Sequence, residues 1–211
     1  MLTRDEAWRI PANLAKLPEV RAHWPLAAPP AAAVATSMLP NQGTRKMLVR
    51  LAKPDECDAL TELAMRAKAS WGYPDDFMSA CQPELTMTHA KIAAWTVWVA
   101  QSDQTICGMI ALNIQPGSDK AEIEDFFVDP NFHGRGIGAT LMSTLLETCL
   151  SCGVKAVGLD ADPNAEGIYN RLGFTTVGRS PSRSIPGRML PRMELRLDRA
   201  PKHDMSEQRR Q

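Results

Sequence analysis

The sequence lacks a long apolar run and an excess of charge of either sign. No apolar stretch approaches the roughly 20 residues that a membrane-spanning helix needs. Lys and Arg number 24, and so do Asp and Glu, so the formal net charge is zero. We therefore expect no nucleic-acid or membrane partner. Charges scattered through Arg4, Asp5, Glu6 and Arg9, with no apolar run after them, predict that there is no secretory signal.

Cysteine is also scarce, with five residues in all. An odd count in a chain with enough apolar residues for a core favours reduced thiols and a cytoplasmic location. Cys149 and Cys152 form a Cys-x-x-Cys pattern at the end of a predicted amphipathic helix, but no second Cys or His pair follows at zinc-finger spacing. We expect structural cysteines here rather than a redox or metal site, and no bound metal.

The 211 residues predict one domain with an appendage at each end. Residues 1–45 include a Pro/Ala-rich stretch at 25–33, which is poorly suited to a packed core, and are predicted to be a flexible extension. The domain is predicted at 46–198, and a polar, disordered tail at 199–211.

Within the domain, strand-like and helix-like patterns alternate. Their order is β-α-α-β-β-β-α-β-α-β-β, which predicts an α/β fold with a mixed sheet and helices on both faces. The expected strands span 47–51, 95–100, 105–114, 122–128, 155–160, 175–179 and 193–197, and the expected helices span 54–68, 75–81, 136–152 and 165–172.

The most informative segment is a glycine-rich turn between the strand at 122–128 and the helix that follows. Gly134, Gly136 and Gly138 remove side chains from the turn, so that backbone N–H groups can converge at a helix N-terminus. Such a nest binds phosphate or pyrophosphate. The sequence thus predicts a cofactor that carries phosphate.

One interpretation of this turn is a dinucleotide site. Gly134-x-Gly136-x-x-Ala139 fits the G-x-G-x-x-G/A pattern, and Asp160 follows about 20 residues on, where a ribose-binding acid is expected. Two observations count against it. Residues 129–133 separate the glycines from the preceding strand, and only about fifty residues follow Asp160, too few to complete a doubly wound sheet.

A second interpretation accounts for more residues. The segment 121–139 resembles the acetyl-CoA signature of the GNAT superfamily of N-acetyltransferases: a strand, Val-Asp-Pro, then Q/R-x-x-G-x-G/A. His133 stands where the family usually has Gln or Arg. A second family landmark is an Asn after the next strand and then an aromatic pair before Leu-Gly-Phe. This chain has Asn164 there, and Tyr169 before the Leu-Gly-Phe at 172–174. The resemblance covers about residues 47–198.

The resemblance implies a GNAT-type fold in which the strands at 122–128 and 155–160 splay apart to admit the pantetheine arm of acetyl-CoA. The arm is then expected to bond to unpaired backbone near 126–128, and to Asn164, which alternatively caps the next helix. The resemblance makes the cofactor-binding candidates Phe126, Phe127, Val128, His133, Gly134, Arg135, Gly136, Ile137, Gly138, Ala139, Thr140 and Asn164.

The implied reaction moves the acetyl group directly to a primary amine of a small molecule or to an amino-terminal group, through a ternary complex. A backbone N–H near Val128 is expected to hold the thioester oxygen. Tyr169, one of only two tyrosines, matches the general acid that protonates the departing sulfur. Glu122 and Glu124 are the candidate bases. Strict strand alternation puts them on one face and Asp125 on the other, unless a bulge intervenes.

The acceptor wall implied by the family lies between the first two helices. Trp71, Tyr73 and Asp125 are the candidate substrate-binding residues, because aromatic rings beside acids suit an ammonium group. The resemblance also allows a homodimer. The alternative functions are a catalytically silent acyl-CoA-binding regulatory protein and, less favoured, an NAD-binding oxidoreductase.

Overall fold

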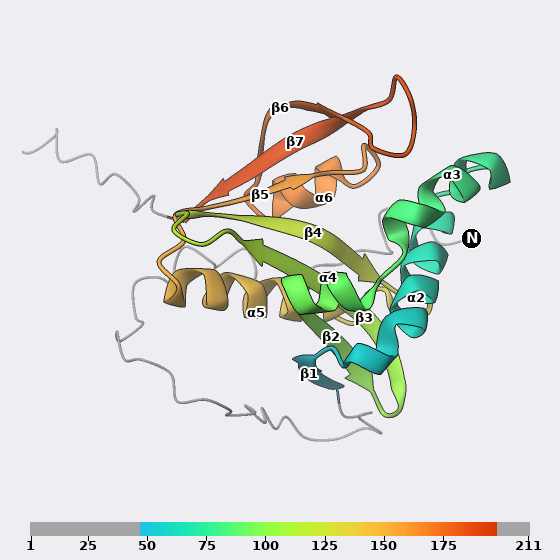
Figure 1. Ribbon diagram of the computed structural model, residues 1–211, viewed down its shortest axis with the longest axis horizontal. Helices are drawn as coiled ribbons and strands as arrows, with labels where there is room; N and C mark the ends of the chain where they lie inside the picture. The colour runs from blue at the N-terminus through green and yellow to red at the C-terminus, as the bar shows by residue number, and fades with distance from the viewer. Residues whose placement is uncertain (1–46, 198–211) are drawn as a thin grey trace, which may run out of the picture.

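The computed structural model describes residues 47–197, so the extension predicted at 1–45 and the tail from 199 lie outside the described residues. Seven strands form one sheet in the order β1-β2-β3-β4-β5-β7-β6 (Figure 1). Neighbouring strands are antiparallel except β4 and β5, which are parallel. The strands are β1 (Met47–Leu51), β2 (Thr96–Ser102), β3 (Thr105–Ile114), β4 (Lys120–Val128), β5 (Ala156–Asp160), β6 (Thr175–Pro181) and β7 (Met189–Arg196).

Helices cover both faces of this sheet. Leu141, Leu145 and Leu146 of α5 pack with the α6 side chains against one face, while Leu60 and Leu63 of α2 pack with α3 against the other. The helices are α2 (Cys57–Ala69), α3 (Asp75–Leu85), α4 (His89–Ala94), α5 (Ile137–Ser151) and α6 (Glu166–Arg171), with 3-10 turns η2 (Pro54–Glu56) and η3 (Pro130–Phe132).

The predicted α/β class with a mixed sheet is confirmed, but α4 was missed. This helix has only six residues, too few to show a helical period, and the Thr88 side chain caps it by accepting from the Lys91 amide. Two boundaries differ by four residues, and the others by three or fewer. Helix α3 continues past Cys81 with Pro83 inside its last turn, and β7 begins at Met189 rather than 193.

The sheet excludes the dinucleotide fold. A doubly wound domain needs several adjacent parallel strands. Here β2, β3 and β4 form an antiparallel meander before the glycine turn, and β4–β5 is the one parallel pair among residues 47–197. The glycine pattern therefore lies in a different architecture from the one it resembles in isolation.

The parallel pair is also short, which creates the opening on which the site depends. Only Lys120, Ala121 and Glu122 of β4 pair with β5. The rest of β4, residues 123–128, pairs with β3 on one side and with no β5 residue on the other. Figure 1 shows β4 and β5 diverging from this point.

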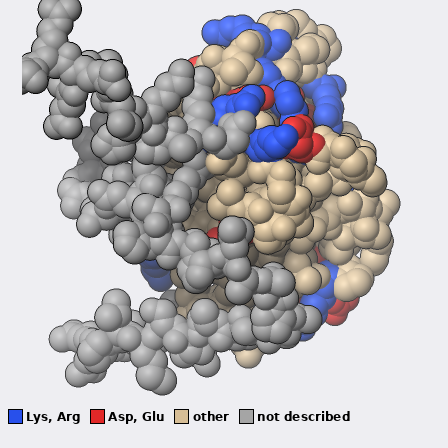
Figure 2. Space-filling model, turned by 90° about the vertical axis from the view of Figure 1, so that its left-hand side faces the viewer, with Lys and Arg blue, Asp and Glu red and all other residues tan. Residues whose placement is uncertain are grey.

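The surface carries charges of both signs. On the face in Figure 2, Lys and Arg side chains gather toward the top with Asp and Glu among them, above a broad area of other residues. Across residues 47–197, no helix is both long and apolar enough to cross a bilayer.

Candidate active site

A cavity of about 980 Å³ opens where β4 and β5 diverge. Helices α2, α3 and α4, strand β4, the β5–α6 segment and the β6–β7 loop all contribute to its wall. Nine of the residues predicted from the sequence line it: Trp71, Glu124, Asp125, Phe126, Phe127, Val128, His133, Asn164 and Tyr169. The structure thus brings together residues that are almost a hundred positions apart in the chain.

The glycine turn leads from His133, which lines this cavity, into the beginning of α5, and residues 134–140 themselves do not line the cavity. Gly134 and Gly136 both have φ of 76°, the left-handed region that glycine adopts without strain. At the start of α5, the first amide with a backbone acceptor is that of Thr140, which donates to the Gly136 carbonyl at 3.0 Å. The amides before it have no preceding helical turn to bond to, so Ala139 carries the last outward-facing N–H group.

Two side chains of the turn are held within it. His133 Nε2 lies 3.2 Å from the Val128 carbonyl, and because a carbonyl only accepts, this nitrogen carries the proton. Burial lowers the pKa of His133, which favours the neutral ring. The Arg135 guanidinium donates to the Asn131 carbonyl at 3.3 Å and lies 4.9 Å from the Phe132 ring centroid. Through these contacts with Asn131 and Phe132, Arg135 stabilises the turn.

The three carboxylates of β4 share one face because the strand bulges. Ala111 of β3 pairs with Asp125 and Leu112 pairs with Ile123, which leaves Glu124 as the extra residue. The expectation from strict alternation, with Asp125 opposite the two glutamates, is therefore wrong. The bulge, which the sequence analysis left open, turns Asp125 toward the cavity wall formed with α3 and α4.

The environments of these carboxylates differ. Arg192 holds Glu122 through two nitrogens, one of them 2.7 Å from Oε2, and Glu122 does not line the cavity. Glu124 accepts from the Asn113 side-chain amide at 2.9 Å. Asp125 is 8% exposed and has no hydrogen-bond partner among residues 47–197. Burial raises the pKa of Asp125 to about 6.

Tyr169 presents its ring from α6, between two phenylalanines. Its centroid lies 6.4 Å from that of Phe126 and 5.6 Å from that of Phe174. Its hydroxyl has no hydrogen-bond partner within residues 47–197, although the residue lines the cavity. Burial raises the pKa of Tyr169, so the hydroxyl keeps its proton.

Asn164 does not cap α6, so that alternative is wrong. The N-cap is Ala165, which has no side-chain hydrogen bond to the helix. The Asn164 side chain instead donates to the Tyr73 hydroxyl at 2.9 Å. Tyr73 is not among the residues that line the cavity, and burial raises its pKa to about 12.

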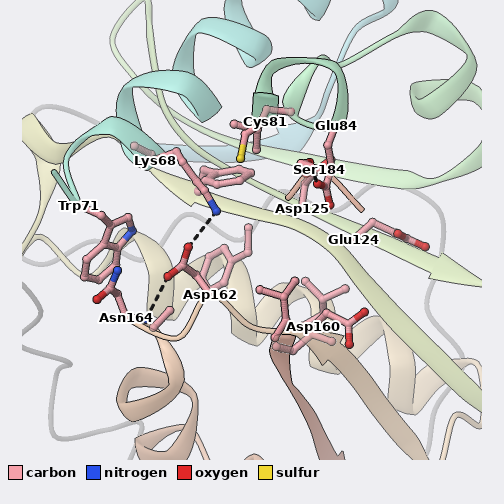
Figure 3. A pocket seen from close by; sticks show the side chains of 18 of the residues that line it. Lys68, Trp71, Cys81, Glu84, Glu124, Asp125, Asp160, Asp162, Asn164 and Ser184 are labelled. Atoms are coloured by element: carbon pink, nitrogen blue, oxygen red, sulfur yellow. Dashed lines mark hydrogen bonds and ion pairs between the residues drawn. The ribbon is translucent and has the colours of Figure 1, made fainter. Parts of the chain in front are cut away.

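Sequence analysis missed a charged cluster around that hydroxyl. Asp162 accepts from Lys68 Nζ at 2.8 Å, from the Tyr73 hydroxyl at 2.8 Å and from Arg188 at 3.3 Å. Figure 3 shows Lys68, Asp162 and Asn164 together at one end of the cavity. No local sequence pattern shows that the segments 68–73 and 160–164 meet residue 188.

The family model for the acetyltransferase (GNAT) family matches residues 58–174, more than half of the chain. This chain belongs to the GNAT family. The match runs from α2 to the Leu-Gly-Phe after α6, so it includes the glycine turn, the bulged strand and the divergence of β4 from β5.

Individual relatives are more distant. Glucosamine 6-phosphate N-acetyltransferase of Trypanosoma brucei brucei is 36% identical over 83 residues, 37% of this chain and 56% of that protein. N-acetylaspartate synthetase of Rattus norvegicus is 26% identical over 150 residues, 70% of this chain and 50% of that protein. The chain thus spans about half the length of these curated relatives.

Solved structures share the fold. The PaiA N-acetyltransferase of Thermoplasma acidophilum, in complex with coenzyme A, matches with a TM-score of 0.57 at 18% identity. The match covers 72% of this chain and 99% of that one. At this identity the likeness shows the fold alone.

Proposed function

We propose that this protein transfers an acetyl group from acetyl-CoA to a primary amine of a small molecule or to an amino-terminal group, by direct transfer in a ternary complex. The observation that carries the proposal is the stretch of β4 at 123–128, which lacks a β5 partner and lines the cavity, followed along the chain by the outward-facing amides at the start of α5. A single ligand with a polar arm and a pyrophosphate would use both features. Its arm would bond to the open strand edge, and its pyrophosphate would bind at the helix end.

The amides from Arg135 to Ala139 would hold the pyrophosphate, and the backbone of Phe126 to Val128, on the strand edge that has no β5 partner, would hold the pantetheine arm. Acetyl-CoA supplies the activated thioester. The coenzyme A bound to the T. acidophilum protein supports this assignment by fold analogy. The Val128 region would then contribute an N–H to the thioester oxygen.

The acid and base follow from the environments of the side chains. Asp125 is a better candidate base than Glu122 or Glu124, since it lines the cavity and has no hydrogen-bond partner among residues 47–197. With a pKa of about 6 it is mostly ionised near neutral pH and can accept a proton from an ammonium group. The amine nitrogen then bonds to the acetyl carbon, the carbon–sulfur bond breaks, and Tyr169 protonates the departing sulfur. The second proton that the nitrogen loses as the amide forms restores the Tyr169 hydroxyl, and Asp125 releases its proton to solvent.

Thiol release tests the proposal. Free coenzyme A, measured while the protein is incubated with acetyl-CoA and a panel of primary amines, should appear faster with at least one amine than with none. Tight coenzyme binding without amine-dependent release would favour a regulatory acyl-CoA-binding protein. A cytoplasmic location and a homodimer remain predictions from the sequence.

A further inference from the structure

The charged cluster at one end of the cavity holds two cations and one carboxylate. The side chains of Lys68, Arg188 and Asp162 are only 15%, 17% and 12% exposed. Both cations also lie beside a stacked pair of rings, Tyr73 and Phe77, whose centroids are 4.1 Å apart. Rings partly offset the cost of burying a cation, but the cluster still carries one positive charge in excess.

The Asp162 carboxylate accepts four hydrogen bonds. The donors are Lys68, Arg188, the Tyr73 hydroxyl and the backbone amide of Asn164. Burial disfavours its charge, but the hydrogen bond and charge of Lys68, aided by the other donors, keep the pKa of Asp162 below its usual range. Asp162 therefore stays ionised and balances one of the two cations.

Part of the Arg188 guanidinium makes no hydrogen bond within residues 47–197. Both of its side-chain hydrogen bonds within residues 47–197 use Nη2, at 2.7 Å to the Tyr73 hydroxyl and 3.3 Å to Asp162. Nε and Nη1 have no acceptor among residues 47–197. No fully buried side-chain nitrogen or oxygen in that part of the chain lacks a partner, so these two nitrogens are not fully buried. Arg188 also lines the cavity, where a ligand could meet them.

Planar guanidinium donors with no acceptor, beside a second cation, match the two oxygens of a carboxylate or phosphate. Figure 3 places Lys68 and Asp162 toward one end of the cavity and Asp125, with Glu84 and Ser184, toward the other. An acceptor that carries its amine at Asp125 and an acidic group at Arg188 would satisfy both ends.

We propose that Arg188 and Lys68 bind a carboxylate or phosphate of the amine acceptor, so that the preferred acceptors carry an amine and an acidic group. This inference rests on the proposed acetyl transfer and narrows its substrate class. Arg188 acts as a specificity residue: it selects the acceptor and has no part in moving the acetyl group.

Matched acceptor pairs test the proposal: 2-aminoethyl phosphate with ethanolamine, glucosamine 6-phosphate with glucosamine, and β-alanine with its amide. The wild-type kcat/KM should favour the acidic member of at least one pair by about tenfold or more, as expected for a charge-assisted hydrogen bond. Comparison between pairs separates a preference for phosphate from one for carboxylate.

Arg188→Gln should cut that preference by about tenfold while changing kcat/KM for the neutral member less than about threefold. Lys68 and Asp162 remain as a balanced pair in this variant, so folding should survive. Arg179→Gln, on the exposed face of β6 and outside the cavity, is the matched control and should keep the full preference. Equal use of both members by the wild type, or equal slowing of both by Arg188→Gln, would overturn the proposal.

Binding provides a readout that does not depend on turnover. Calorimetric titration of the coenzyme-saturated protein with the same pairs should give tighter binding for an acidic member, and Arg188→Gln should lose the difference. If no amine releases thiol but this binding difference is present, the acetyl-transfer proposal fails and the acidic-group site stands. If no acidic member binds better than its neutral partner, or if Arg188→Gln weakens acetyl-CoA binding instead, the inference is wrong.

Discussion

At the scale of single residues, neighbours rather than residue type separate the three carboxylates of β4. Glu122 is held by Arg192, Glu124 accepts from Asn113, and Asp125 is buried with no hydrogen-bond partner in the described part of the chain. The sequence identified this acidic group and the strand that bears it. It did not rank the three, because the ranking depends on one bulge and on an arginine 70 positions away.

The ionised Asp125 carboxylate should lower the free energy of unfolding at neutral pH. Its folded pKa of about 6 lies above the unfolded value near 4, so the native state binds more protons between these values. Stability contributed by the neutral form is present below about pH 4 and is lost as the pH rises through 6. Asp125→Asn should therefore raise the free energy of unfolding by up to about 3 kcal/mol at pH 7.5, and by little at pH 4.

Urea unfolding at the two pH values measures this difference. Glu122→Gln is the control, since it removes an ion-paired carboxylate from the same strand and should bring no such gain. Equal stabilisation by Asp125→Asn at both pH values would mean that its carboxyl titrates normally. The same variant should also lose most of its turnover.

Tyr169→Phe keeps the ring between Phe126 and Phe174 and removes only the hydroxyl. Loss of a general acid should lower kcat about 10²-fold or more, while the Kd for acetyl-CoA stays within about twofold. Steady-state kinetics and calorimetry on the same sample measure the two quantities. An unchanged kcat would remove Tyr169 as the acid.

At the scale of elements, the position of α5 depends on a glycine in the neighbouring strand. A Cβ on Gly108 of β3 would lie 2.8 Å from Ile137 Cγ2 and 3.1 Å from Leu141 Cδ1. Real carbon atoms do not approach so closely, so the helix would have to shift. Ile137 is the first residue of α5, and the amides of that turn would move with it.

Gly108→Ala should cost about 1–3 kcal/mol of stability through overpacking and should weaken acetyl-CoA binding as well. Urea unfolding and calorimetry check the two effects. Gly178→Ala on β6 is the matched control, because a Cβ there meets nothing within 4 Å. Unchanged coenzyme affinity in a destabilised Gly108→Ala would separate the packing of α5 from the binding of the cofactor.

The local patterns predicted most elements and their order. The glycine turn, the alternation in β2 to β4 and the amphipathic α2 and α5 each carry their signal within a few residues. Helix α4 was missed because its six residues rely on the Thr88 cap and on packing. The first residues of β7 were not predicted as strand because Met189 to Pro191 pair with β6, and the sequence of one segment does not show this pairing.

At the scale of the whole molecule, three loops meet that the sequence analysis treated separately. Tyr73 follows α2, Asp162 follows β5, and Arg188 precedes β7, yet their side chains form one network. The sheet order brings them together, since β7 lies between β5 and β6. The site therefore depends on the complete fold, and the Lys68, Asp162 and Arg188 cluster was out of reach of local motif reasoning.

The most direct test is calorimetric titration of the purified protein with acetyl-CoA, with NAD as the comparison ligand and two glycine variants as controls. Gly136→Leu and Gly117→Leu impose the same backbone strain, because both glycines have φ of 76°, but only Gly136 lies at the start of α5. Saturable binding of acetyl-CoA alone, kept by Gly117→Leu and lost by Gly136→Leu, is the predicted result. Binding of NAD, or of neither ligand by a folded sample, would contradict the acetyl-CoA site on which the account depends.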